Sequence, residues 1–308
     1  MGVGSSALFS LTNDERVLSA CSELGMDSVP QECIALILFH LDPPEICRLA
    51  RVSRTFQEAA SSEFVWESKL PPTYDSIVKR VLPPAAVPLS KKDLFARLCR
   101  SNSFDGGNKV TWLDQSCGMP FVLISYKAMR ITGIDDRRCW THISSAESRF
   151  NGVAFLRKTW WLEVIGELEF PFPPGSYRLF FKLRLGLTSR SRRSWRQGRS
   201  SYTVNGWDKA PVRFQLSSSE GQYASSEFYL QGHGNWVHYS AGDFAVGGEN
   251  SPATIKFSMS QIDCTHSKGG LCLDSVIVCP IRIDRQSTDT LPLLEKNSRA
   301  TETLHKPI

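Results

Sequence analysis

The fold of the N-terminal part is decided by residues 29–56, which read VPQECIALILFHLDPPEICRLARVSRTF. In the first half of this stretch, the apolar residues that share one helix face are Cys33, Ile34, Ile37, Leu38 and Leu41. Leu36 and Phe39 lie outside that stripe, so the predicted helix is apolar nearly all round. Such a helix is expected to be buried on more than one side.

Capping signals divide this stretch into three short helices. Ser28 and Gln31 form a capping-box pattern for the first helix, and Asp42 and Glu45 form one for the second. A third helix is predicted to start at Ser53. The three helices and their flanks amount to about 45 residues, a length that rarely buries a self-sufficient core. Because the segment carries more apolar surface than it can hide, it must pack on the rest of the chain or dock onto another protein.

The same residues carry a family resemblance. A Pro-x-Glu start, an Ile-Leu-x-x-Leu helix, a Pro-x-acid-aliphatic turn and a Val-Ser-basic step occur in order and are closed by Trp66. This ordered series resembles an F-box. The resemblance implies a three-helix module that binds a Skp-type adaptor and, through it, a cullin-RING ubiquitin ligase. The residues that it implies at or just behind the adaptor contact, some of which can equally be F-box core, are Pro30, Ile37, Leu41, Ile46, Leu49 and Val52.

The character of the sequence changes once, near residue 105. Residues 71–100 are predicted to form two more helices, capped by Thr73 and Ser90, as a spacer behind the F-box. Residues 101–108 (SNSFDGGN) have the composition of a turn and linker. The predicted divisions are a flexible segment at 1–25, an F-box at 26–70, a helical spacer and linker at 71–108, a β domain at 109–284 and a disordered tail at 285–308.

Alternation at period two dominates the C-terminal half. Apolar residues recur at every second position in 177–185, 212–216 and 255–259, and Leu162 and Val164 begin a further such face. Each of these segments is predicted to be a strand with one buried face. With roughly ten such segments between Gly, Pro and Ser turns, a β-sandwich or jelly roll is the most economical fold.

Several blocks of the β domain resemble the phloem-protein-2 or Nictaba-like lectins. They read MRITGIDDRRCW (129–140), SRF (148–150), WWLEVIGE (160–167), GWDKAPVRF (206–214) and GGLCLDSVIV (269–278). The resemblance implies a jelly-roll domain that binds N-acetylglucosamine oligomers or N-glycan cores. An F-box followed by such a domain is a plant arrangement. The predicted fold class is therefore a small helical F-box and a helical spacer, followed by an all-β, lectin-like sandwich.

A sugar site needs a flat indole face and polar groups that accept hydrogen bonds from hydroxyls. The resemblance offers Trp140, Trp236 and Asp243 as carbohydrate-binding residues. The first tryptophan of the family's site falls on Gly133, and its first acid falls on His238. Since a buried tryptophan is most often part of a core, Trp140 and Trp236 can equally be core residues.

Composition bounds the class of protein. The chain has 308 residues, of which 41% are hydrophobic, and its net charge is +5. The nine cysteines include no C-x-x-C pair, which argues against a disulfide framework and a structural zinc site. The sequence shows no signal peptide and no apolar run long enough to span a bilayer. Gly2 and Ser6 fit the loose myristoylation pattern, although a flexible tail explains them as well.

Three functions are consistent with these features, and none requires catalysis, a cofactor or a metal. The first is the substrate receptor of a Skp–cullin–F-box ligase that captures a protein or glycoprotein. The second is a free-standing lectin of the cytoplasm or nucleus. The third, which we rank last, is contact with nucleic acid through the basic segment Arg184–Arg199.

Overall fold

A computed structural model describes residues 29–83, 89–187, 203–247 and 252–281. The chain divides into two compact units, and each is described by itself. The helical unit comprises the described residues up to Leu70, together with 89–95 and 115–117. The β unit comprises the remaining described residues. The predicted Ser28 cap, the flexible segment 1–25 and the tail 285–308 lie outside the described residues.

The helical unit is built on four short helices. They are α2 (Gln31–Phe39), α3 (Pro43–Leu49), α4 (Arg54–Ala59) and α5 (Glu63–Glu67). The side chains that form its core are Ile34, Ala35, Leu38, Ile46, Phe56, Ala59, Ala60, Val65 and Trp66. The indole nitrogen of Trp66 donates a hydrogen bond to the Ala60 carbonyl (2.7 Å), which fixes the ring inside the bundle.

The starts of α3 and α4 agree with the sequence, whereas α2 begins at Gln31 with Pro30 in the N-cap position where Ser28 was predicted. The Ser53 hydroxyl accepts a hydrogen bond from the Phe56 amide (3.4 Å) at the start of α4. Asp42 occupies the N-cap position of α3 without a side-chain cap bond, so the predicted capping box with Glu45 is absent there. Proline at the first two positions of α3 removes two of the amides that a cap would satisfy.

The first predicted spacer helix belongs to the β unit. This helix, α6 (Tyr74–Val81), is preceded by Thr73, whose hydroxyl donates to the Pro171 carbonyl (2.8 Å) instead of capping the helix. The Arg80 guanidinium lies 4.0 Å from the Glu169 carboxylate. Residues 71–83 therefore pack on the β unit and do not form a free spacer.

The second spacer helix forms as predicted, whereas the linker differs from expectation. Ser90 caps α7 (Lys91–Leu98) as predicted, accepting from the Asp93 amide (3.1 Å). Residues 101–108, predicted to be a linker, instead contain strand β1 (Asn102–Phe104), which pairs with β2. Gly106 and Gly107 both have positive φ (67° and 82°) and form the turn between these strands. The sheet therefore begins at Asn102, because Asn102 and Phe104 bury their side chains.

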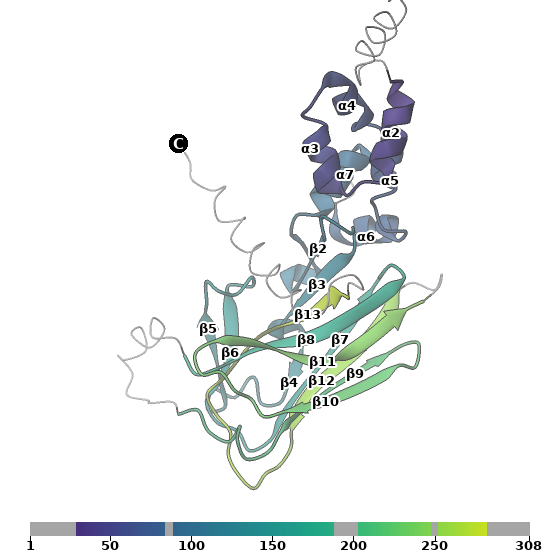
Figure 1. The fold of residues 1–308 in the computed structure, drawn as a ribbon. Coiled ribbons are helices and arrows are strands. Elements are labelled where there is room, and N and C mark those ends of the chain that lie inside the picture. Colours follow the sequence, from purple (N-terminus) through teal and green to yellow (C-terminus); the bar gives the residue numbers. More distant parts are fainter. Residues whose placement is uncertain (1–28, 84–88, 188–202, 248–251, 282–308) are drawn as a thin grey trace, which may run out of the picture. The chain divides into compact units, whose positions relative to one another are not determined.

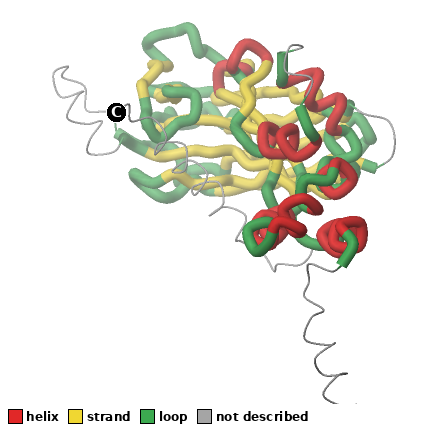
Figure 2. The backbone as a smooth tube through the Cα atoms, turned by 90° about the horizontal axis from the view of Figure 1, so that it is seen from above, coloured by secondary structure: helices red, strands yellow, loops and turns green. Residues whose placement is uncertain are grey.

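The β unit consists of two antiparallel sheets that stack as layers (Figures 1 and 2). Its strands after β1 are β2 (Lys109–Leu113), β3 (Pro120–Ser125), β4 (Arg130–Ile131), β5 (Trp140–Ser144), β6 (Gly152–Leu156), β7 (Leu162–Phe170), β8 (Gly175–Leu185), β9 (Val212–Ser218), β10 (Tyr223–Phe228), β11 (Trp236–Val246), β12 (Ala253–Gln261) and β13 (Leu271–Pro280). This arrangement confirms the predicted helical module followed by a β-sandwich.

Strand β13 is the centre of the eight-stranded sheet. One of its edges pairs with β8, which pairs in turn with β11. Its other edge is shared, because Leu271–Leu273 pair with β6 and Ser275–Val278 pair with β3. The sheet thus forks at Asp274, where the register against β8 also shifts. A bulge of this kind redirects a side chain locally.

The five-stranded sheet has the order β10-β9-β12-β7-β4. The alternation predicted for β7, β9 and β12 is confirmed, since their inward residues are buried. The side chain of Phe181 on β8 packs against this sheet, and its ring centroid lies 5.3 Å from that of Phe214 and 5.8 Å from that of Phe257. These rings form the interior of the sandwich.

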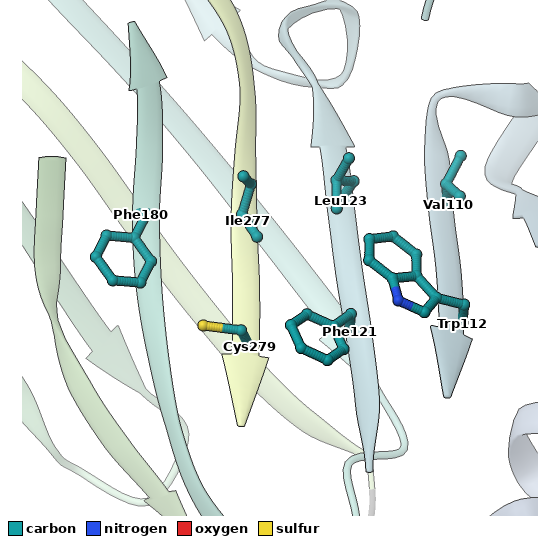
Figure 3. Close-up of a cluster of buried hydrophobic side chains, with 7 residues drawn as sticks. All are labelled: Val110, Trp112, Phe121, Leu123, Phe180, Ile277 and Cys279. Carbon is teal, nitrogen blue, oxygen red and sulfur yellow. The ribbon is translucent and has the colours of Figure 1, made fainter. Parts of the chain in front are cut away.

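The other face of the eight-stranded sheet is also covered. Figure 3 shows a buried cluster on it, made of Val110, Trp112, Phe121, Leu123, Phe180, Ile277 and Cys279. Phe150, from the segment 145–151 between β5 and β6, packs against this cluster. The prediction that 177–185 has a single buried face is therefore wrong, because Phe180 and Arg184 on the second face are buried too.

Candidate functional sites

The helical unit exposes large apolar side chains beside a closed core. They are Leu36, Ile37, Val52 and Phe64. Ile37 is 53% exposed and Val52 is 70% exposed. Phe64 stacks on Phe39 of α2, with ring centroids 4.8 Å apart, so the apolar surface continues from α2 onto α5. Water-exposed apolar groups of this size are typical of an interface with another protein.

The six predicted adaptor residues separate into three groups. Pro30, Ile37 and Val52 are exposed, whereas Leu41 and Leu49 are half-buried. Ile46 has no exposed surface and belongs to the core, which is the alternative that the sequence left open for it. It lies on the inward side of α3, a direction that the sequence alone does not fix. Leu36 and Phe64, which were not among the six, are exposed.

Trp140 is part of the core and not a sugar platform. Its side chain is 1% exposed, and its indole nitrogen donates to the Thr132 carbonyl (3.0 Å). No face of this ring is available to a pyranose, so the assignment of Trp140 to a glycan site is wrong. Gly133, at the place of the family's first tryptophan, has a φ of +71°. A side chain there would strain the backbone.

Trp236 and Asp243 both lie on β11 but do not form one site. Trp236 is opposite Arg184 on β8, and Asp243 is opposite Arg178. Seven positions of strand put their Cα atoms on the order of 20 Å apart. The Asp243 carboxylate is engaged by Arg178 in two hydrogen bonds of 2.5 and 2.7 Å. The three predicted sugar residues are therefore spread over the domain.

His238 takes the place of the family's first acid on β11, opposite Lys182. Burial and, to a smaller extent, the charge of Lys182 together lower the pKa of His238 to about 4. The imidazole is therefore neutral at neutral pH. Its ring meets Phe180 edge to face at 6.3 Å, which is a packing role and leaves no carboxylate here for a sugar.

A polar cluster around Trp236 was not predicted from the sequence. The Glu147 carboxylate accepts hydrogen bonds at the same oxygen, Oε2, from Trp236 Nε1 (2.7 Å) and from Arg184 Nη1 (2.5 Å). The Arg184 guanidinium lies 4.3 Å from the centre of the Trp236 ring. Glu147 is 37 residues from Arg184 and 89 residues from Trp236 along the chain. No local signal indicates such a contact.

A second ion pair, between Asp274 and Lys182, lies next to this cluster. Asp274, at the fork of the sheet, accepts from Lys182 Nζ (2.8 Å) and from the Ser148 hydroxyl (2.5 Å). The Lys182 ammonium is also 5.1 Å from the Trp236 ring. Arg184, the first residue of the predicted nucleic-acid segment, is thus buried and paired, and 188–202 lies outside the described residues.

Two tryptophans are exposed at one end of the sandwich. Trp160 and Trp161 lie between β6 and β7, and Ile262 lies beside them because Leu162 pairs with Gln261. Lys268 has no exposed surface. Its ammonium donates to the carbonyls of Trp160 (2.8 Å) and Asp263 (2.5 Å). This buried lysine connects the backbone at Trp160 to the loop that contains Asp263.

A short helical module followed by a two-sheet sandwich is the arrangement expected of an F-box protein with a lectin-like domain. Family models agree: F-box-like matches residues 26–70, and Phloem protein 2 matches residues 120–280. The chain belongs to the F-box proteins that carry a phloem protein 2 domain. This confirms both resemblances seen in the sequence.

The chain is similar over most of its length to relatives from Arabidopsis thaliana. It is 50% identical to F-box protein PP2-A11 over 83% of this chain and 88% of that protein. It is 50% identical to F-box protein PP2-A13 over 84% of this chain and 89% of that protein. Against a family 35 carbohydrate binding module from Clostridium thermocellum, the TM-score is 0.32 at 14% identity, over 52% of this chain and 98% of that one. A likeness this low bears on no ligand.

Within the described ranges, no helix has the length and apolarity required to cross a membrane.

Proposed function

We propose that this protein is the non-catalytic substrate receptor of a Skp–cullin–F-box ubiquitin ligase, working in the cytoplasm or nucleus. Its helical unit binds the Skp-type adaptor, and its β unit holds a protein or glycoprotein substrate. The ubiquitin chemistry lies in the partner subunits, and this chain contributes proximity and orientation.

The observation that carries the proposal is the contrast between core and surface in the helical unit. Ile34, Leu38 and Ile46 close the core completely, with at most 1% of each residue exposed. The exposed side chains of Ile37 and Val52 are therefore not needed to fill it. Burying a side chain of this size stabilises by about 1.5–3 kcal/mol. An adaptor that covers Ile37 and Val52 gains the exposed part of this energy, on the order of 1–2 kcal/mol for each side chain.

The test is the double substitution Ile37→Asp with Val52→Asp in the full chain. Losing two apolar contacts removes about 3 kcal/mol, so affinity for a purified Skp-type adaptor should fall about 100-fold. The matched control is Ile262→Asp in the β unit, because Ile262 is also 53% exposed.

Biolayer interferometry against the adaptor measures the affinities, and circular dichroism checks that each variant is folded. Unchanged adaptor binding by a folded double variant would remove the proposal. So would the failure of the wild-type chain to bind any Skp-type adaptor.

A second candidate function is glycan binding at a place other than the predicted one. The observation that favours it is the exposed pair Trp160 and Trp161, since exposed indole faces are the groups on which pyranose rings stack. On an array of N-acetylglucosamine oligomers and N-glycans, saturable binding that is lost in Trp161→Ala but kept in Trp236→Phe would support it. A wild-type chain that binds no glycan on the array would reject it.

A further inference from the structure

The Glu147 carboxylate is held in a way that separates it from an ordinary surface ion pair. Two donors converge on its oxygen Oε2, one from Arg184 and one from Trp236. Arg184 is only 3% exposed, and its Nε is buried without a hydrogen-bond partner. The side chain of Glu147 is 52% exposed. Arg184 is thus buried in the sheet and Trp236 is half-buried beside it, whereas the acid that they hold is largely exposed.

The sheet places the backbones of the two donors, and neither strand carries Glu147. Arg184 and Trp236 are directly opposite each other in the β8–β11 pairing. The guanidinium packs 4.3 Å from the centre of the indole ring, so each group orients the other. Glu147 belongs to the segment 145–151, which connects two other strands. If the acid moved away, the donors would stay in place as an empty receptor.

Charge counting shows which ligand the receptor fits. Lys182 and Asp274 neutralise each other at 2.8 Å. His238, opposite Lys182, is neutral at neutral pH because burial lowers its pKa to about 4. One positive charge of the cluster, that of Arg184, therefore remains, and Glu147 is the acid that balances it. A single-charge anion that presents one oxygen to two N–H donors satisfies the site, and a carboxylate has this chemistry.

We propose that Arg184 and Trp236 form a carboxylate-binding site that Glu147 occupies from within the chain, and that a carboxylate of a bound protein takes its place. The part that concerns a bound protein rests on the proposed function as a substrate receptor. An intramolecular carboxylate competes at an effective concentration in the millimolar range or above. Glu147 therefore admits only ligands that bring further contacts, which makes it a filter against free acids.

The test uses acetate as the probe and the full-length chain. Glu147→Ala removes the internal competitor, so acetate should bind this variant at least about tenfold more tightly than it binds the wild type. Glu147→Gln keeps the side-chain size and one acceptor oxygen, and should also bind acetate more tightly than the wild type. The Glu147→Gln variant therefore tests the proposal even if Glu147→Ala does not fold. Glu167→Ala, which removes an exposed acid from β7, is the matched control and should behave as the wild type.

The readout is the indole N–H resonance of Trp236, identified by its loss in Trp236→Phe. Sodium chloride at equal ionic strength corrects for salt. A saturable shift with acetate in both Glu147 variants, at least about tenfold weaker in the wild type and in Glu167→Ala, supports the site. If the folded Glu147 variants show no saturable shift, the proposal is overturned. Tighter binding of inorganic phosphate than of acetate would overturn the assignment to carboxylates.

Two capped tripeptides distinguish the sources of the carboxylate. Acetyl-Gly-Asp-Gly-amide carries it on a side chain, and acetyl-Gly-Gly-Gly with a free end carries it at the C-terminus. Binding of either peptide to Glu147→Ala, with no binding of its neutral analogue (Asn in place of Asp, or an amidated C-terminus), supports the site and identifies its ligand. Failure of both overturns the role in protein recognition. None of these titrations involves the adaptor, so their outcome is independent of whether the helical unit binds one.

Discussion

Replacing Trp140 by alanine tests whether this residue is core or sugar site. A buried tryptophan removes about 150–250 Å² from water, which at about 25 cal/mol per Å² corresponds to about 4–6 kcal/mol. Comparable substitutions in protein cores cost about 3–5 kcal/mol. Since Trp140 is 1% exposed and its indole is hydrogen-bonded to Thr132, we expect a loss of about 4 kcal/mol.

Pulse proteolysis of the full chain in urea measures this loss for the β unit, because its protected fragment is recognised by mass. With a denaturant slope of about 2 kcal/mol per molar, the midpoint should fall by about 2 M. Trp140→Phe retains most of the apolar contact but leaves the Thr132 carbonyl without its donor, and should cost about 1–3 kcal/mol. The exposed Trp161→Ala should change stability by at most about 0.5 kcal/mol.

The result that would refute this reasoning is a Trp140→Ala variant with the urea midpoint of the wild type. It would mean that the ring is not enclosed. Conversely, the expected loss means that a failure of Trp140→Ala to bind a glycan could not be attributed to a missing sugar contact. Trp161→Ala is the better variant for that purpose.

Three further predictions follow from packing and protonation. Gly166→Ala should cost about 1–3 kcal/mol in urea unfolding, since the new methyl group would overlap the Phe257 ring, and an unchanged midpoint would contradict this. His238 has a pKa of about 4 against an ordinary value of 6.5, because it is buried and lies near a lysine, so the unfolded chain takes up a proton in that window which the folded chain does not. The contribution of His238 to the free energy of unfolding should therefore be fully present above pH 6.5 and fall by at most roughly 3 kcal/mol towards pH 4. In His238→Gln this pH-dependent contribution should be absent. Iodoacetamide at pH 8 should label the exposed Cys264 but not Cys272 or Cys279, because burial raises the pKa of these thiols to about 11 and about 12; labelling detected by mass spectrometry at either would contradict their burial.

The helical unit and the individual strands could be predicted because their signals are local. The cap at Ser53 and the alternation in β7, β9 and β12 depend on residues within one helix turn or one strand. The same local argument failed for β8, where Arg184 was expected on a solvated face. It is buried because a distant segment lies over that face, and Glu147 supplies the partner.

The candidate site could not be predicted because strand order is not local information. Leu271 and Ser275 lie four residues apart on β13 but face different neighbours, β6 and β3. Motif resemblance placed Trp140, Trp236 and Asp243 in one site, although the sheet separates them. Resemblance identifies which residues recur in a family, whereas the pairing of strands determines which of them meet.

The central position of β13 has a consequence for how the protein is made. Val122 on β3 pairs with Val278 on β13, so this contact closes only after nearly the whole β unit has left the ribosome. Contacts of such long sequence separation make folding slow. Until β13 is made, β3, β6 and β8 pair only with β2, β5 and β11, and each presents one unpaired edge to other chains. We therefore expect the nascent receptor to depend on chaperones, and truncations before Leu271 to aggregate during synthesis.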